Sequence, residues 1–365
     1  MLPTQSAFRT ISTAPDDRGN LDDLCVRRHR RPQALSAAFA ACAVDAICFV
    51  HSATPMPVPP STARCALGLD AGGSATRWAL ADVDGTVFAE GRVAPASGLQ
   101  MLTPEGRAAL ADTLAALAAA LPRRPAAAAA GISGLDATQC GAFAALLADA
   151  LALDAAAVHA RSDIEMLCRA AFADAPPGTG IVLYAGTGSI AALLDATGVL
   201  QRAGGRGHLI DDAGGGHWIA REALARVWRV EDESPGAWHA SPLARALFAH
   251  IGGSDWAATR RYVYGHAAAE RGRLGALALA VAEAADDDLA ARTLLEDAGR
   301  ELARPVQALV HRFGPQPVVL AGRVFELHPA IAAALRAELP AHSVLRPLGM
   351  PPHHACALLA LRAAR

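Results

Sequence analysis

The chain has no excess of positive charge. Its 33 Lys and Arg residues are slightly outnumbered by 35 Asp and Glu residues, which leaves a formal net charge of −2 at pH 7. Proteins that hold the phosphate backbone of nucleic acid need a concentrated basic surface, so this balance argues against a nucleic-acid partner.

Closely spaced cysteines are missing as well. The chain has seven cysteines, an odd number, and none of them belongs to a Cys-x-x-Cys pair. This pattern fits neither a disulfide framework nor a cysteine zinc site, and it predicts a protein of the reducing cytoplasm.

The sequence also lacks an apolar run long enough to cross a membrane. Residues 34–50 are mildly apolar, but they include Asp45 and are too short and too polar for a span. An Arg-rich stretch precedes them and a Pro-rich stretch follows, an order that resembles a signal peptide but begins far from Met1. We favour a disordered extension or an early gene-start assignment for residues 1–63 and expect the folded protein to begin near Arg64.

What the sequence does contain is one short pattern, twice. The first copy consists of Gly73-Ser74, four further residues and then Ala-Leu-Ala-Asp-Val-Asp-Gly. The second copy consists of Gly186-Thr187, four further residues and then Ala-Leu-Leu-Asp-Ala-Thr-Gly, at a constant offset of 113 residues. Each copy predicts a strand, a tight turn, a second strand, an Asp-x-x-Gly hairpin and a third strand. Small residues let backbone N–H groups approach closely, so two facing turns predict a clamp around a phosphate chain.

Strands alternate with helices in both halves of the chain. Helices are predicted over 104–121, 137–150 and 164–173, with buried strands over 126–132, 157–161 and 317–322 and mainly helices after Trp218. This alternation predicts an α/β fold with two lobes and a cleft between them. We expect a first lobe over 64–146, joined by a C-terminal helix over 352–365, and a second lobe over 147–351.

Asp70 ends the first predicted strand, directly before the first glycine turn. A carboxylate there can hold Mg²⁺ beside a bound phosphate chain. The position 113 residues later is Leu183, so the sequence predicts that only one lobe handles the metal. A plain hairpin turn with an exposed Asp is the alternative, and the repeat weakens it.

The second copy reads Tyr184-Ala185-Gly186-Thr187-Gly188-Ser189 after a strand. Its glycines permit a tight turn, and its hydroxyls can donate to phosphate oxygens. The segment is no Walker A loop because Gly-Lys-Ser/Thr does not follow, and no dinucleotide motif because a strand follows in place of a helix.

Two further segments carry polar groups on glycine-rich turns. Asp136 follows a strand and a Ser-Gly-Leu turn, where a kinase would place the carboxylate that accepts the substrate hydroxyl's proton; a helix N-cap is the alternative. The stretch 204–220 holds polar groups on a glycine-rich segment that leads into a helix, as a substrate-binding loop would, with a mobile surface loop as the alternative. His353 and His354 have no acidic partner at helix spacing, which favours the start of the last helix over a metal site.

Together these segments resemble a known family. The motifs at 70–74, 185–189, 207–214, 218–220 and 319–324 are similar, in order, to those of the N-acetylglucosamine kinase branch of the sugar kinase and actin superfamily. That branch is grouped with the BadF/BadG/BcrA/BcrD ATPases. The resemblance implies a duplicated ribonuclease-H-like, actin-like ATPase fold that closes over Mg-ATP and an amino sugar, and it suggests a homodimer.

The resemblance also assigns residues by position. It implies that Asp70, the candidate metal ligand, belongs to the first phosphate loop and that Asp136 is the catalytic acid. The residues that it implies for the nucleotide are Gly72, Gly73, Ser74, Arg77, Gly186, Thr187, Gly188, Ser189, Gly322 and Arg323. Those that it implies for the sugar are Asp163, Gly207, His208 and Asp212.

The chain departs from the family where the sugar would bind. Ile190 replaces an Asn that touches the sugar, and Ser97-Gly98-Leu99 replaces an early Ser-x-Asn sugar contact. Arg206 replaces a Trp, and residues 211–213 read Asp-Asp-Ala in place of Gly-Asp-Glu. An apolar side chain cannot replace an amide hydrogen bond to a hydroxyl, so the identity of the sugar stays open.

Three functions compete on this basis. An ATP-dependent amino-sugar kinase is favoured. An ATPase that activates a partner enzyme would use a cysteine-bound iron–sulfur cluster, and the lack of closely spaced cysteines counts against it. A sugar-responsive transcriptional regulator would need a DNA-binding helix pair near the N-terminus, which the basic run there does not supply.

Overall fold

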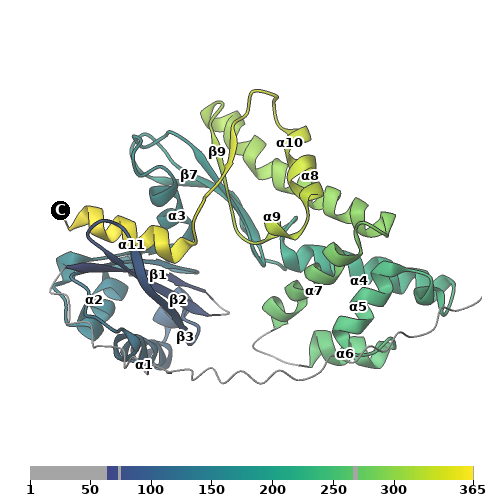
Figure 1. Ribbon diagram of the computed structural model, residues 1–365, viewed down its shortest axis with the longest axis horizontal. Coiled ribbons are helices and arrows are strands. Elements are labelled where there is room, and N and C mark those ends of the chain that lie inside the picture. Colours follow the sequence, from purple (N-terminus) through teal and green to yellow (C-terminus); the bar gives the residue numbers. More distant parts are fainter. Residues whose placement is uncertain (1–63, 73–74, 266–269, 365) are drawn as a thin grey trace, which may run out of the picture. The chain divides into compact units, whose positions relative to one another are not determined.

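The computed structural model describes residues 64–72, 75–265 and 270–364 (Figure 1). The expectations for residues 1–63 therefore lie outside the described residues. Within the described ranges, no helix combines the length and the apolar character needed to cross a membrane.

The first sheet has five strands in the order β3-β2-β1-β4-β5. Antiparallel pairing joins β1 to β2 and β2 to β3, and parallel pairing joins β1 to β4 and β4 to β5. The strands are β1 (Cys65–Ala71), β2 (Thr76–Asp82), β3 (Val87–Val93), β4 (Ala127–Ile132) and β5 (Val158–Ser162).

The second sheet repeats this plan, with the order β10-β9-β6-β7-β8. The three strands of the second sequence copy pair antiparallel, and β6, β9 and β10 pair parallel. The strands are β6 (Ile181–Ala185), β7 (Ser189–Leu194), β8 (Leu200–Gly204), β9 (Val318–Ala321) and β10 (Leu345–Pro347). The predicted duplication is therefore confirmed at the level of sheet topology.

The two copies differ by one residue at the glycine turn. The last pair before the turn is Ala71 with Thr76 in the first copy and Ala185 with Ser189 in the second, so the second turn is shorter by one residue. Asp70 therefore corresponds to Tyr184 and not to Leu183, which corrects the alignment at constant offset. Leu183 lies wholly buried in the core, because side chains alternate between the faces of a strand.

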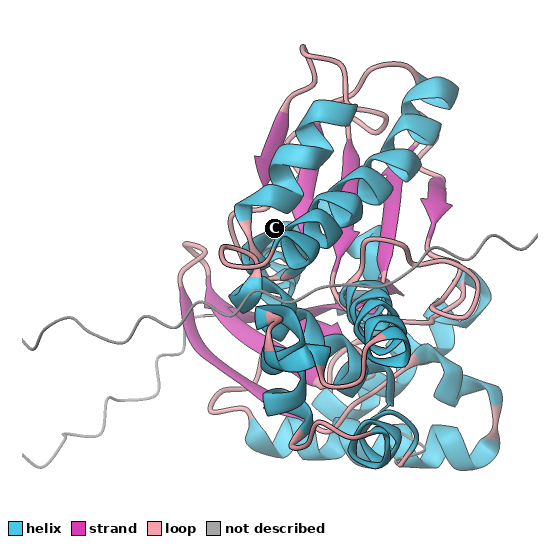
Figure 2. Cartoon of the chain, turned by 90° about the vertical axis from the view of Figure 1, so that its right-hand side faces the viewer, coloured by secondary structure: helices cyan, strands magenta, loops and turns pink. Residues whose placement is uncertain are grey.

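Helices cover both faces of each sheet (Figures 1 and 2). On one face of the first sheet lie α1 and α2, whose leucines and Phe143 pack against Leu67, Leu69 and Leu80. Behind the second sheet, α4, α7 and α8 build the largest core cluster. The helices are α1 (Pro104–Ala120), α2 (Cys140–Leu151), α3 (Asp163–Ala171), α4 (Gly216–Glu233), α5 (Pro242–Ile251), α6 (Trp256–Tyr264), α7 (Glu270–Ala284), α8 (Leu289–Phe313), α9 (Val324–Leu327), α10 (Pro329–Glu338) and α11 (Pro352–Ala363).

Helix α3 packs between the two sheets. Its Met166 belongs to the cluster on the first sheet, whereas Ile164 and Leu167 belong to the cluster on the second. The helix begins after Ser162, whose hydroxyl accepts the Glu165 N–H. Because β5 pairs with β4 in the first sheet, the boundary expected after residue 146 lies too early, and the first sheet extends to Ser162.

Helix α11 returns to the other face of the first sheet, where Cys356 and Ala357 pack on its alanines (Figure 1). Gly68 makes this close approach possible. A Cβ atom added at Gly68 would lie 2.0 Å from the His353 carbonyl oxygen and 2.2 Å from the Ala357 nitrogen. Both atoms are backbone, so neither can move without lifting the helix.

We expect Gly68→Ala to lower the free energy of unfolding by at least about 3 kcal/mol, the upper end of the usual cost of overpacking, because backbone atoms obstruct the added methyl group. Gly141→Ala in α2 is the matched control, since nothing lies near its added Cβ. A helical Gly-to-Ala exchange there should stabilise by roughly 0.5 kcal/mol. Urea unfolding of both variants measures the difference; equal stabilities would show that α11 is not seated on β1 as described.

Candidate active site

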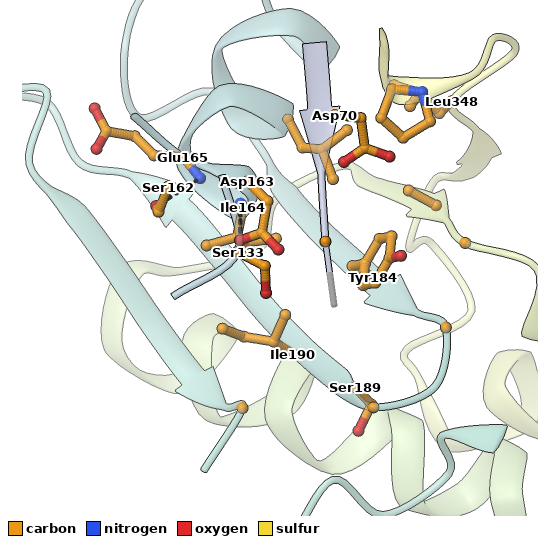
Figure 3. A pocket seen from close by; sticks show the side chains of 18 of the residues that line it. Asp70, Ser133, Ser162, Asp163, Ile164, Glu165, Tyr184, Ser189, Ile190 and Leu348 are labelled. Atoms are coloured by element: carbon orange, nitrogen blue, oxygen red, sulfur yellow. Dashed lines mark hydrogen bonds between the residues drawn. The ribbon is translucent and has the colours of Figure 1, made fainter. Parts of the chain in front are cut away.

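A cavity of about 2380 Å³ is lined by residues of both sheets and of α3 (Figure 3). Ligand pockets usually measure about 300–1,000 Å³, so this cavity has room for a nucleotide and a second substrate. The structure brings most of the predicted site residues together here. The lining includes Asp70, Gly72, Arg77, Asp136, Asp163, Gly186, Thr187, Gly188, Ser189, Gly207, Asp212, Gly322 and Arg323.

Three predicted site residues are not among the lining. Gly73 and Ser74 lie outside the described residues. His208 is described but does not line the cavity, and its ring makes an edge-on contact with His217, with 4.8 Å between ring centres. A direct sugar contact by His208 therefore has no support in this geometry.

Backbone hydrogen bonds from the start of α4 hold the second glycine turn in place. The Gly216 N–H donates to the Gly186 carbonyl at 2.8 Å, and the His217 N–H donates to the Thr187 carbonyl at 3.0 Å. These bonds hold the turn at the positive end of a helix of 18 residues, an arrangement that favours a bound phosphate group.

Ser189 has a different role from the predicted one. Its hydroxyl donates to the Ala213 carbonyl at 2.7 Å, and the residue is 7% exposed. A serine hydroxyl has one proton to donate, so in this arrangement Ser189 ties the turn to the glycine-rich loop and does not offer that proton to a phosphate oxygen. Thr187 lines the cavity and keeps its predicted place.

Asp70, Asp163 and Tyr184 surround the same part of the cavity, and they come from β1, α3 and β6 (Figure 3). Burial, and after it the negative charge of Asp163, raises the pKa of Asp70 to about 6, while Arg77 acts in the opposite direction. Burial also raises the pKa of Tyr184 to about 12, and the two carboxylates add to this effect. The tyrosine therefore keeps its proton and is a hydrogen-bond donor at neutral pH.

This donor set fits a hard divalent cation. Mg²⁺ prefers oxygen ligands and is usually bound through one or two carboxylates together with phosphate oxygens. Asp70 and Asp163 repel each other in partly dehydrated surroundings, and a cation between carboxylates removes that cost. The residues present are therefore suited to the Mg²⁺ that the sequence predicts.

Asp136 lines the cavity but is exposed and serves as a cap. Its Oδ1 accepts the Thr138 backbone N–H at 2.9 Å and the Thr138 hydroxyl at 2.7 Å. The backbone N–H of Asp136 in turn donates to the Gln139 side chain, which completes a capping box on a short 3₁₀ turn. The Thr138 hydrogen bonds hold the pKa of Asp136 below its usual range. The cap is observed, and the catalytic role stays a prediction.

The glycine-rich loop is held firmly at its base. Asp212 is 3% exposed, has a positive φ of 58°, and accepts the Gly207 N–H at 3.1 Å. Its neighbour Asp211 pairs with Arg304 of α8 at 2.9 Å. These bonds count against a loosely attached surface loop. The tip of the loop, Leu209-Ile210, is largely exposed, at 89% and 80%.

The turn after β9 depends on glycine. Gly322 has a φ of +96°, and an added Cβ would lie 2.2 Å from the Ala185 carbonyl oxygen on the neighbouring strand. This close approach places Arg323 in the cavity lining, together with the second glycine turn.

Sequence reasoning missed the role of Tyr184. The signal was present, because Tyr184 directly precedes the second turn, but an alignment at constant offset placed Leu183 opposite Asp70. The second turn is shorter by one residue, which places Tyr184 opposite Asp70 in place of Leu183, and this shows only in the strand pairing.

The model of the BadF/BadG/BcrA/BcrD ATPase family matches residues 67–342, about three quarters of the chain. The chain belongs to this ATPase family. Membership of this ATPase family implies that the nucleotide is ATP, in agreement with the two glycine turns. The matched range contains both turns and the segment that ends at Arg323.

Solved structures of similar proteins have the same fold. A candidate N-acetylglucosamine kinase from Chromobacterium violaceum is 29% identical, with 82% of this chain and 99% of that chain covered and a TM-score of 0.60. A candidate N-acetylglucosamine kinase from Porphyromonas gingivalis is 16% identical, with 82% and 99% covered and a TM-score of 0.62. A glucokinase of the ROK family from Streptomyces griseus, in complex with glucose and AMPPNP, is 16% identical, with the same coverage and a TM-score of 0.56. The fold is therefore the duplicated, two-lobed fold of actin-like ATPases and sugar kinases.

Proposed function

We propose that this protein is an ATP-dependent kinase that phosphorylates a hydroxyl of an amino sugar of the N-acetylglucosamine or glucosamine type. One observation carries the proposal: a cavity large enough for two substrates is lined by residues of both glycine turns and by several carboxylates, among them Asp70, Asp136 and Asp163. The similarity to the Chromobacterium protein supports the choice of an amino sugar.

The phosphate chain of ATP would lie between the two turns. Thr187 and the backbone N–H groups of both turns would bind its oxygens, and Arg323 would lie toward the adenosine side. Asp70, together with Asp163, would hold Mg²⁺ beside the phosphates. When bound, the ion supplies positive charge against the charge that develops on the phosphate oxygens during transfer. The Tyr184 hydroxyl, which keeps its proton, would donate a hydrogen bond to a phosphate oxygen.

The sugar would be positioned by acidic side chains and by the buried loop. Asp163 and Asp212 line the cavity and can accept hydrogen bonds from sugar hydroxyls, and Asp136 would accept the proton of the attacking hydroxyl. Phosphoryl transfer needs this positioning more than covalent help, because the reaction's charge is spread over the transferred group.

Ile190 gives the acceptor side of the cavity an apolar wall. The residue is half-buried, packs against core residues of the second sheet, and leans on the backbone of Gly205. An ammonium group that faced Ile190 would lose its water without gaining a hydrogen bond, which costs free energy. An acetamido methyl group is apolar and would carry no such cost. We therefore expect an N-acetylated amino sugar to be a better substrate than the free amine.

The cysteines weigh against a partner-activating ATPase. All four described cysteines, Cys65, Cys140, Cys168 and Cys356, are free and buried, so the described part of the chain offers no surface thiol to hold an iron–sulfur cluster. Free thiols agree with a cytoplasmic location, which we propose together with the kinase activity. A homodimer stays a prediction.

A coupled ADP-release assay tests the proposal. We expect ADP release to depend on an added sugar in a screen of N-acetylglucosamine, glucosamine, N-acetylmannosamine, glucose and muramic-acid derivatives, with the N-acetylated sugars ahead. Asp136→Asn is the control for a contaminating kinase. ADP release that no sugar stimulates, or that the variant retains in full, would contradict the proposal.

A further inference from the structure

A row of three residues crosses the first sheet beneath the start of α11. Gly68 of β1 pairs with Ala79 of β2, and Ala79 pairs with Glu90 of β3, so the three lie side by side on one face. The two small residues let the first turn of α11 come down onto the sheet, as the contact at Gly68 shows. This approach brings His353 and His354 over Glu90.

Both imidazoles converge on one carboxylate oxygen. The Nε2 atom of His354 lies 2.6 Å from Glu90 Oε2, and the Nε2 atom of His353 lies 3.4 Å from the same oxygen. Glu90 is the acidic partner that the sequence did not predict, because it lies 263 residues away along the chain. One donor atom from each of the three residues falls within 4.8 Å of the others.

The cluster is closed on one side and open on the other. His353 is buried, and its Nδ1 atom has no hydrogen-bond partner among the described residues. His354 is half-buried, and the Glu90 side chain is 59% exposed. Bonds of about 2.0–2.2 Å from zinc to nitrogen or oxygen put tetrahedral ligands roughly 3.3 Å apart, close to the separation of His353 from Glu90. The exposed Glu90 can turn to bring His354 to the same separation.

We propose that Glu90, His353 and His354 form a binding site for a divalent transition metal such as Zn²⁺, which fastens the start of α11 to β3. Two imidazoles and one carboxylate are a donor set that zinc accepts, with a fourth position left to water. Imidazole nitrogen suits zinc, copper and nickel and not Mg²⁺, so this site differs in chemistry from the carboxylates in the cavity.

The buried Nδ1 atom sets the expected strength of the site. A metal-bound histidine usually donates its other ring N–H to an acceptor, and loss of such a partner weakens metal binding by about 10–100-fold. His353 has no such acceptor among the described residues. We therefore expect a reversible site, weaker than a structural zinc centre, that stabilises α11 when it is filled.

The test uses the full chain after treatment with a chelator. Co²⁺ serves as the probe, because its visible absorption reports a tetrahedral site, and Zn²⁺ serves as its competitor. We expect the wild-type protein to bind one more equivalent than Glu90→Gln or His354→Gln, excess Mg²⁺ to leave that equivalent in place, and Zn²⁺ to displace it. Zn²⁺ should also raise the melting temperature of the wild-type protein, and it should not raise that of Glu90→Gln or His354→Gln.

His342→Gln is the matched control, because His342 is exposed, lies between α10 and β10, and does not belong to the cluster. It should keep the additional equivalent. Difference measurements are needed because residues 1–63 also contain histidines and cysteines. Equal stoichiometry and equal Co²⁺ spectra in the wild-type protein and Glu90→Gln would overturn the proposal and leave a hydrogen-bonded cluster without a metal. Glu90→Gln changes an exposed side chain, so loss of the fold would not obscure the result.

Discussion

Asp70→Asn should resist urea better than the wild-type protein at neutral pH and yet transfer phosphate about 10²–10³-fold more slowly. The gain in stability follows from the partly dehydrated carboxylate and its repulsion by Asp163, both of which the neutral amide removes. The loss of activity follows because the amide would hold Mg²⁺ less well than the carboxylate, and the loss of one electrostatic contribution to the transition state commonly costs that factor. Opposite effects of this kind mark a residue kept for function at the expense of stability.

The stability difference should depend on pH in a defined direction. The pKa of Asp70 rises from 3.8 to about 6 on folding, so between these values the folded protein binds a proton that the unfolded chain has lost. Stability of the wild-type protein without ligands therefore falls as pH rises through this interval. The variant lacks this loss, so its advantage should be near zero below the interval and complete above it.

The expected advantage is about 1–2 kcal/mol. A shift of this size corresponds to about 3 kcal/mol at most, and the residue's remaining contact with water reduces it. Asp84→Asn is the matched control. That exposed carboxylate accepts the Thr86 N–H, which lowers its pKa, so its loss should bring no gain. Urea unfolding across this pH range, together with ADP-release kinetics, measures both effects; a destabilised Asp70→Asn would contradict the account of the site.

Asp136→Asn should lower kcat by about 10²–10⁴-fold, the range typical of general acid–base groups, with the KM for ATP little changed. The substitution is informative because Asn and Asp cap helices almost equally well. The amide oxygen can still accept the Thr138 N–H, so the free energy of unfolding should stay within roughly 0.5 kcal/mol of the wild-type value. A loss of turnover would then belong to the carboxylate and not to the cap.

Asp136→Ala and Asp163→Asn complete the comparison. The alanine variant removes both the carboxylate and the cap, so it should lose the same activity and also about 1 kcal/mol of stability. Asp163→Asn should change the KM for the sugar as well as kcat, because Asp163 lines the cavity at the start of α3. Full turnover in Asp136→Asn would show that Asp136 only caps its turn, and it would contradict the proposed function as stated.

Much of the fold could be predicted from the sequence because its signals are local. The Asp-x-x-Gly hairpins are one example: Gly85 and Gly198 both have a positive φ, and both donate an N–H to the carbonyl three residues earlier. A turn of this kind depends on a few adjacent residues, which the sequence shows directly. The predicted helices and parallel strands follow in the same way from apolar periodicity.

The functions of particular side chains were less predictable. Asp136 and Ser189 lie on the expected turns, but their hydrogen bonds to Thr138 and to Ala213 show only in the folded chain. A polar side chain on a turn can face a ligand or satisfy the backbone, and the sequence pattern is the same for both.

By itself, the sequence determined that this protein has two copies of one α/β unit, each with a glycine turn after its first strand, because repeats and turn residues are read from neighbouring positions. Only the tertiary structure decided that Tyr184 stands opposite Asp70 and that Glu90 meets His353 and His354. The physical reason is that strand register and the seating of a distant helix depend on contacts between residues far apart in the chain. Because the second glycine turn is shorter by one residue, Tyr184 and not Leu183 faces the cavity. Gly68 in β1 lets α11 pack closely on the sheet, which brings His353 and His354 to Glu90.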